Sequence, residues 1–250
     1  MPGSQCAEER RIVQWVAKGE LPGLIRRKVM PAQVVMDVGS GIRPQTLVWP
    51  RVHICVEVHD EYVKYLCERL SGSPRYLVVH SPWEDALRTM ASKSVDSVIA
   101  LDFIEHLSKD DGWTFLAQAE RIARRQVVLF TPLGYIAQSY EGAEAKDRWG
   151  MHGGYWQTHR SGWTPDDFSE DWEIIGCRDY HVADQHGPLD QPIGCIWAIR
   201  TFGSMPGGGH IPIGRLESQL WLKTMTYRHF PGWFLSPLRR IKRLLAPARA

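Results

Sequence analysis

Three side chains that could do chemistry follow an apolar stretch of the sequence. Asp102, Glu105 and His106 come directly after the run SVDSVIAL, which has the length and composition of a buried strand. If a helical turn begins at Asp102, the three residues are spaced i, i+3 and i+4 and lie on one face. Two carboxylates and an imidazole on one face suit an octahedral divalent ion such as Mg2+ or Mn2+. Alternatively, Asp102 caps the next helix, and Glu105 and His106 form an ordinary polar turn.

A second imidazole lies further along the chain. His159 precedes the stretch WTPDDF, in which Thr164 and Pro165 predict the start of a short helix. Imidazole titrates near neutral pH, so His106 and His159 are the candidate general bases if no metal binds. His152 and His181 are less favoured, because they are expected in a loop and on a strand surface.

A glycine-containing loop follows an earlier apolar run, VVMDV. Asp37, Gly39 and Gly41 stand at the carboxyl end of this expected strand, where glycines permit a tight turn and close approach to a ligand. Glu57 ends the next expected strand, where a carboxylate can accept both hydroxyls of a ribose. The loop lacks the third glycine of a dinucleotide-binding fingerprint, since Pro44 occupies that position.

The pattern D-x-G-x-G resembles the cofactor motif of class I methyltransferases, and three further segments match that family in order and spacing. SPWEDAL resembles the family's acidic loop beside the adenine, and VDSVIALDFIEHL and QVVLFTP resemble its fourth and fifth strands. The resemblance extends from about residue 33 to residue 200. It implies S-adenosylmethionine as cofactor, with Trp83 covering the adenine and Glu84 or Asp85 accepting its amino group. The other implied cofactor contacts are Asp37, Gly39, Gly41, Glu57 and, through the ammonium group, Asp102.

A narrower resemblance concerns the acid and imidazole residues. E/D-x-x-E-H, followed by a distant histidine before W-T-x-x-x-F, resembles metal-dependent O-methyltransferases, including ubiquinone-pathway catechol enzymes and small-RNA 3′-terminal 2′-O-methyltransferases. It implies metal ligands at Asp102, Glu105, His106 and His159, and catalytic roles for His106, His159 and Asp102. Position 102 departs from the family pattern, because Asp replaces the usual Glu and its side chain reaches less far by one methylene.

The order of the expected elements predicts an α/β fold. Short apolar runs alternate with helical patterns up to Pro132, which predicts a doubly wound, mostly parallel sheet of the Rossmann-like class I methyltransferase kind. A long loop with one short helix is expected over 133–164, followed by two antiparallel edge strands, the last of which completes the sheet. A helix is expected over 7–19. The expected domains are an N-terminal helical segment (1–30), the methyltransferase domain (31–202), and a glycine-rich hinge with a basic tail (203–250).

Charge and aromatic content indicate the kind of partner. The net charge of +2 and the mixed charges of the long loop argue against a nucleic-acid substrate. Aromatic side chains in that loop can stack on sugars, aromatic rings and bases alike, although for any single one burial of the loop is the favoured interpretation. They are Tyr140, Trp149, Tyr155, Trp156 and Trp163. We expect the acceptor to be a hydroxyl of a glycan or lipid-linked saccharide. The alternatives are a phenolic or quinone-type molecule, or a catalytically silent cofactor-binding module.

Cysteine usage and the two ends of the chain predict its location. The five cysteines show no metal-ligand spacing, and the N-terminus lacks an apolar signal core, so a cytoplasmic protein is expected. In the tail, Ser236 and Pro237 open an amphipathic pattern with four basic residues, Arg239, Arg240, Lys242 and Arg243. Such a helix either packs on the domain or contacts an anionic membrane surface. No obligate protein partner is expected.

Overall fold

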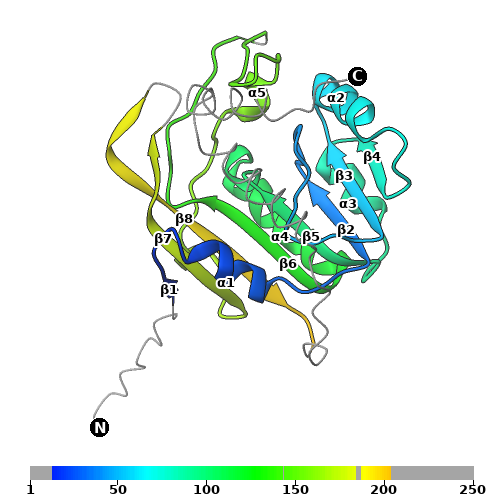
Figure 1. The fold of residues 1–250 in the computed structure, drawn as a ribbon, viewed down its shortest axis with the longest axis horizontal. Coiled ribbons are helices and arrows are strands. Elements are labelled where there is room, and N and C mark those ends of the chain that lie inside the picture. Colours follow the sequence, from blue (N-terminus) through cyan, green and yellow to red (C-terminus); the bar gives the residue numbers. More distant parts are fainter. Residues whose placement is uncertain (1–12, 143, 184–186, 204–250) are drawn as a thin grey trace, which may run out of the picture.

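A mixed sheet organises the computed structural model, which describes residues 13–142, 144–183 and 187–203 (Figure 1). Within these residues the strand order is β1-β7-β8-β6-β5-β2-β3-β4. The strands are β1 Val13–Trp15, β2 Val34–Val38, β3 Val52–Glu57, β4 Tyr76–His80, β5 Val95–Leu101, β6 Ala123–Pro132, β7 Trp172–Ala183 and β8 Pro188–Thr201. The helices are α1 Leu21–Lys28, α2 Asp60–Leu70, α3 Trp83–Thr89, α4 Lys109–Ile122 and α5 Gly154–Gln157, with 3-10 turns η1 Ile104–His106 and η2 Pro165–Asp167.

Strand direction confirms the expected fold class. Strands β4, β3, β2, β5 and β6 are parallel, whereas β8 is antiparallel to both β6 and β7. The sheet is therefore mostly parallel with an antiparallel last strand. Because parallel strands point the same way, the carboxyl ends of β2, β3, β5 and β6 meet at one edge, where open α/β sheets bind ligands.

Helices cover both faces of the sheet, as a doubly wound fold requires (Figure 1). On one face, Leu21 and Ile25 of α1 join the apolar cluster beneath β2, β5 and β6. On the other face, Leu87 of α3 and Phe115 of α4 belong to a second cluster. Every residue of β5 is buried, as expected for a central strand covered on both sides.

The expected N-terminal helix is wrong over Val13–Trp15, which form β1 instead. This short strand pairs in parallel with β7, placing Trp15 opposite Gly176. The Trp15 indole occupies the space above Gly176, where an added Cβ would come within 2.3 Å of the ring, and Arg178 stacks on the indole at 4.0 Å. Packing on the sheet therefore outweighs the helical spacing of the apolar residues. Residues 16–19 are not helical either, and residues 1–12 lie outside the described residues.

Three other expectations are confirmed only in part. The last two strands are antiparallel as expected, but neither is an edge, because β7 lies between β1 and β8. The segment expected as an acidic loop forms α3, beginning at Trp83. The long loop does contain one short helix, α5, and η2 carries a capping box between Thr164 and Asp167.

The expected hinge and basic tail lie outside the described residues. Within the described residues, none of the helices has the length and apolar character of a membrane span.

Candidate functional site

The glycine loop begins at the carboxyl end of β2, and its two glycines do different things. Both have left-handed backbone angles, with φ +65° at Gly39 and +54° at Gly41. A Cβ at Gly39 would lie 2.2 Å from the Phe103 ring, whereas a Cβ at Gly41 would meet nothing within 4 Å. Gly39 is therefore needed for packing against the loop after β5. Gly41 is the position where the backbone is open to a ligand.

Glu57 lies at the carboxyl end of β3 and holds the glycine loop. Its carboxylate accepts hydrogen bonds from the backbone N–H groups of Gly41 at 2.8 Å, Val58 at 2.9 Å and His59 at 3.0 Å. Burial raises the pKa of this carboxyl, and the three N–H groups oppose that effect. A carboxylate has about four lone-pair sites, so these bonds leave acceptor capacity for one further donor.

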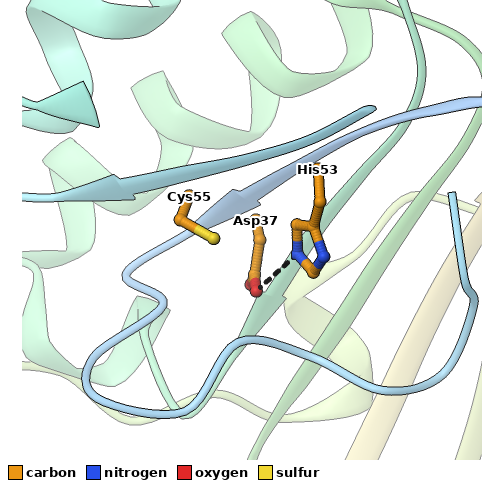
Figure 2. A group of neighbouring side chains, drawn as sticks. All are labelled: Asp37, His53 and Cys55. Carbon is orange, nitrogen blue, oxygen red and sulfur yellow. Dashed lines mark hydrogen bonds and ion pairs between the residues drawn. The ribbon is translucent and has the colours of Figure 1, made fainter. Parts of the chain in front are cut away.

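Asp37 is buried beneath the glycine loop (Figure 2). Its Oδ2 accepts from the backbone N–H of Gln45 at 2.7 Å and lies 3.1 Å from Nε2 of His53. Cys55 completes a group with metal-ligand atom types within 4.8 Å of one another. Burial, and then the charge of Asp37, raise the pKa of the Cys55 thiol, which therefore stays protonated. We interpret this group as a hydrogen-bonded network that shapes the loop from inside.

The residues expected beside the adenine lie on α3. Trp83 is buried and packs edge to face against Phe115, with ring centroids 5.5 Å apart. Glu84 and Asp85 are exposed in the first turn, and Asp85 pairs with Arg88. The adenine contacts of Trp83, Glu84 and Asp85 stay predictions.

Asp102 follows β5 in a left-handed conformation, with φ +49°. Such an angle is uncommon outside glycine, although Asp and Asn adopt it more readily than other residues. The Asp102 charge raises the pKa of His106, His159 and His181, against the dominant effect of burial, which lowers all three. The carboxylate is therefore close enough for its charge to act on all three imidazoles.

His181 was not favoured by the sequence, and its position follows from strand direction. Strand β7 is antiparallel to β8, and β8 is antiparallel to β6, so the carboxyl end of β7 lies on the same edge as that of β6. His181 occupies this end of β7. The sequence could have predicted this placement if the directions of the last two strands had been followed from β6.

Glu105 is the buried carboxylate of the η1 turn. Its side chain is 2% exposed, and its Oε2 accepts from the Thr131 hydroxyl of β6 at 3.0 Å. Its backbone carbonyl accepts from the N–H groups of Arg160 and Ser161. Glu105 is thus fixed both to the sheet and to the segment that carries His159.

His106 and His159 face each other, with ring centroids 5.0 Å apart. Nδ1 of His106 lies 3.2 Å from the carbonyl of Thr158, and Nδ1 of His159 lies 2.9 Å from the carbonyl of Ile136. A carbonyl can only accept, so both bonds require a proton on Nδ1. In the neutral rings, the lone pair is then on Nε2, which is the arrangement of metal-binding and general-base histidines.

Burial keeps both rings neutral. It lowers the pKa of His106 to about 4, with His159 as the next cause, and it also lowers the pKa of His159. Ligand atoms of Glu105, His106 and His159 all lie within 4.8 Å of one another. The described structure therefore brings together three of the four expected metal ligands, and this group does not include Asp102.

The long loop after β6 also contacts α2. Asp147 accepts a short hydrogen bond from the Tyr62 hydroxyl of α2, and both groups are buried. His152 contacts Glu61 of the same helix at 2.8 Å. These anchors, which the sequence analysis missed, place the loop between α2 and η1, and α5 lies at its top in Figure 1.

Comparison with solved structures identifies the fold. A proposed methyltransferase of Bacillus halodurans C-125 matches with a TM-score of 0.50 at 11% identity, covering 74% of this chain and 100% of that chain. An S-adenosylmethionine-dependent methyltransferase of Archaeoglobus fulgidus has a TM-score of 0.43 at 13% identity, over 74% and 94% of the two chains. Magnesium protoporphyrin IX methyltransferase of Synechocystis PCC 6803, crystallised with S-adenosylmethionine, has a TM-score of 0.42 at 12% identity, over 73% and 77%. No protein-family model and no curated protein sequence matches this chain.

The strand order and the first of these likenesses together assign the class I methyltransferase fold. At this level of identity the likeness extends to the fold and not to the reaction.

Proposed function

We propose that this protein is an S-adenosylmethionine-dependent O-methyltransferase. The observation that carries the proposal is the convergence of Glu105, His106 and His159 at the carboxyl edge of the sheet, with both Nε2 lone pairs set by backbone carbonyls. Such a group can take a proton from a hydroxyl or bind a divalent ion. The group lies near the glycine loop, because Phe103, which precedes the turn that carries Glu105 and His106, packs against Gly39.

The residues of the glycine loop fit the cofactor. Gly41 leaves open space for close approach of a ligand, and Glu57 keeps acceptor capacity for a ribose hydroxyl. Nε2 of His59, two residues after Glu57, is buried and has no hydrogen-bond partner among the described residues. An unpartnered polar atom beside an expected ligand site supports a missing polar group there.

The donor set also fits a metal ion. Two imidazole nitrogens and one carboxylate suit a transition ion such as Mn2+ better than Mg2+, which prefers oxygen ligands. Glu105, His106 and His159 would hold the ion, and Asp102 would be left to contact the cofactor's ammonium group. When bound, the ion would lower the pKa of a coordinated hydroxyl.

The protein's own groups account for the remaining chemistry. Methyl transfer from a sulfonium is an in-line displacement, so the acceptor oxygen and the methyl group must be held near contact. As the oxygen attacks, Nε2 of His159 or His106 accepts the hydroxyl proton. Burial lowers the pKa of both imidazoles, that of His106 to about 4, and we propose His159 as the base in the absence of metal.

Exposed aromatic side chains near the histidines support an acceptor with a ring. Tyr155 and Trp156 of α5 are 55% and 39% exposed, and Tyr135 is 62% exposed. Planar faces of this kind stack on sugars and aromatic rings. We propose a glycan or lipid-linked saccharide hydroxyl as acceptor. A phenolic ring is the alternative that acceptor screening must exclude.

The decisive experiment is an acceptor screen with radiolabelled S-adenosylmethionine, with and without EDTA. Transfer to a saccharide that stops with EDTA and returns with Mn2+ is expected. Full transfer in EDTA would leave the histidines as bases and remove the metal. Cofactor binding without transfer to any acceptor would identify a catalytically silent binding module.

The lipid-linked form of the acceptor depends on the basic tail. Co-sedimentation with vesicles of phosphatidylserine and phosphatidylcholine, comparing the full chain with one ending at Glu217, tests it. Stronger binding by the full chain is expected, because each basic residue near an anionic surface contributes about 1 kcal/mol. Equal binding by the two chains would leave a soluble glycan as the proposed acceptor.

A further inference from the structure

Arg160 connects the two segments that carry the histidines. Its Nη1 donates to the backbone carbonyls of His106 at 2.7 Å and Thr158 at 3.2 Å, and its Nη2 donates to that of Tyr155 at 2.8 Å. The guanidinium also stacks on the Tyr155 ring, 4.6 Å from its centroid. One side chain therefore joins the η1 turn to α5 and to the start of the 158–161 segment.

The backbone around Arg160 makes a separate connection to the same turn. The N–H groups of Arg160 and Ser161 donate to the carbonyl of Glu105 at 2.8 and 3.1 Å. The hydroxyl of Ser161 donates to the carbonyl of Ile104 at 3.3 Å. These bonds do not involve the Arg160 side chain, so the segment is expected to stay docked when that side chain is replaced.

The carbonyl of Thr158 accepts from both Nδ1 of His106 and Nη1 of Arg160. We propose that Arg160 is a positioning residue: it holds the Thr158 carbonyl where that carbonyl fixes the His106 proton on Nδ1, which leaves the lone pair on Nε2. Arginine suits this role because its N–H groups form a rigid planar fork that can span several carbonyls, which a lysine ammonium cannot do. The catalytic consequence rests on the proposed methyl transfer, but the imidazole geometry can be measured without it.

The test compares Arg160→Gln with Arg160→Lys and with a matched control, Arg148→Gln. Arg148 is a second arginine of the same loop and stacks on Trp149 at 5.0 Å. Long-range 1H–15N correlation spectra of the metal-free protein report which ring nitrogen of each histidine carries the proton. The His106 signals are assigned by their loss in His106→Gln, which is needed because the chain has 10 histidines.

We expect His106 to be protonated at Nδ1 in the wild type and in Arg148→Gln, and to populate both tautomers in Arg160→Gln. Once an acceptor is known, kcat of Arg160→Gln is expected to fall by about ten- to a hundredfold, the range caused by small displacements of a reacting group. Arg160→Lys should recover part of this loss, with the KM for S-adenosylmethionine unchanged throughout.

An unchanged His106 tautomer in folded Arg160→Gln would overturn the proposal, and so would an unchanged kcat. If Arg160→Gln does not fold, Arg160→Lys decides the question by the same spectra. If the wild type transfers no methyl group, the proposed function fails, whereas the tautomer result still decides whether Arg160 sets the imidazole.

Discussion

The two halves of the candidate site are built in different ways. In the glycine-loop region, Asp37 and Glu57 are held by groups at most 16 residues away in the sequence, mostly backbone N–H groups. In the histidine region, the contact of His106 with Thr158 spans 52 residues and depends on the long loop. The first region is thus set by local folding of β2 and β3, and the second is set only when the loop docks.

This difference has a consequence for mutations. Changes in the glycine-loop region are expected to affect stability and cofactor binding together, because the carboxylates that hold the loop are also the proposed cofactor contacts. Changes in the histidine region are expected to affect turnover with little effect on cofactor binding. The two regions touch where Phe103 packs on Gly39, which is the place where both could be disturbed at once.

The largest effect is expected for His159→Ala. The variant loses one of the two Nε2 lone pairs, so methyl transfer is expected to fall by about 10²- to 10⁴-fold, the usual contribution of a positioned acid or base. The affinity for S-adenosylhomocysteine, measured by calorimetry, is expected to match the wild type. His152→Ala serves as control, because that loop histidine contacts Glu61 rather than the pair. Comparable losses in both variants would show that the loop, and not the imidazole, is responsible.

The second prediction concerns the contact between the two regions. Gly39→Ala is expected to lower the free energy of unfolding by about 2–4 kcal/mol, since a Cβ adds left-handed strain and overlaps the Phe103 ring. Gly41→Ala is expected to lower it by only about 1–2 kcal/mol, from strain alone, because its Cβ meets nothing. Urea unfolding of both variants measures the difference. Equal stabilities would mean that Phe103 does not press on the loop.

The sequence predicted the local region better than the assembled one, for physical reasons. Apolar runs in the sequence located β2, β3, β5 and β6. The strand at Trp15 was missed because its stability comes from Gly176, far along the chain. Spacing grouped Glu105 with His106 correctly, but it could not show that the left-handed turn at Asp102 removes that residue from the ligand group.

The approach of His159 to His106 was predicted only through a family resemblance. What fixes it is the docking of the loop, through Tyr62 with Asp147 and Arg160 with His106. Neither pair shows a periodic pattern in the sequence. Contacts between polar residues that are far apart in the sequence leave no local pattern, so this part of the site could not be predicted from the residues alone.

A third prediction tests the cofactor side alone. Glu57→Ala is expected to weaken binding of S-adenosylmethionine by about 1–3 kcal/mol, the range for hydrogen bonds to a charged group. Some destabilisation is expected as well, because three backbone N–H groups lose their acceptor. Calorimetry at a temperature where the variant is folded separates the two effects. Affinity equal to the wild type would mean that the carboxyl end of β3 does not bind the ribose.

The smallest effect on methyl transfer is expected for a buried carboxylate far from both regions. Asp96, at the amino end of β5, accepts from the N–H groups of Gln33 and Val34 at 2.7 and 3.0 Å and from Arg124 at 2.7 Å. Burial raises its pKa, but these hydrogen bonds outweigh that effect, so the pKa is lowered overall. Like Asp37 and Glu57 it is a buried carboxylate held by backbone donors, but it lies on the opposite edge of the sheet.

Because folding lowers the pKa of Asp96, its ionised form stabilises the fold fully above the ordinary aspartate pKa of about 3.9. That contribution is lost as the pH falls through the lower value in the folded state. Asp96→Asn is therefore expected to be less stable than the wild type by about 1–2 kcal/mol at pH 7, with the gap closing on acidification. Methyl transfer at pH 7 is expected to be unchanged. A stability gap that does not narrow on acidification would mean that the asparagine disturbs packing, and a loss of turnover would mean that the two edges of the sheet are coupled.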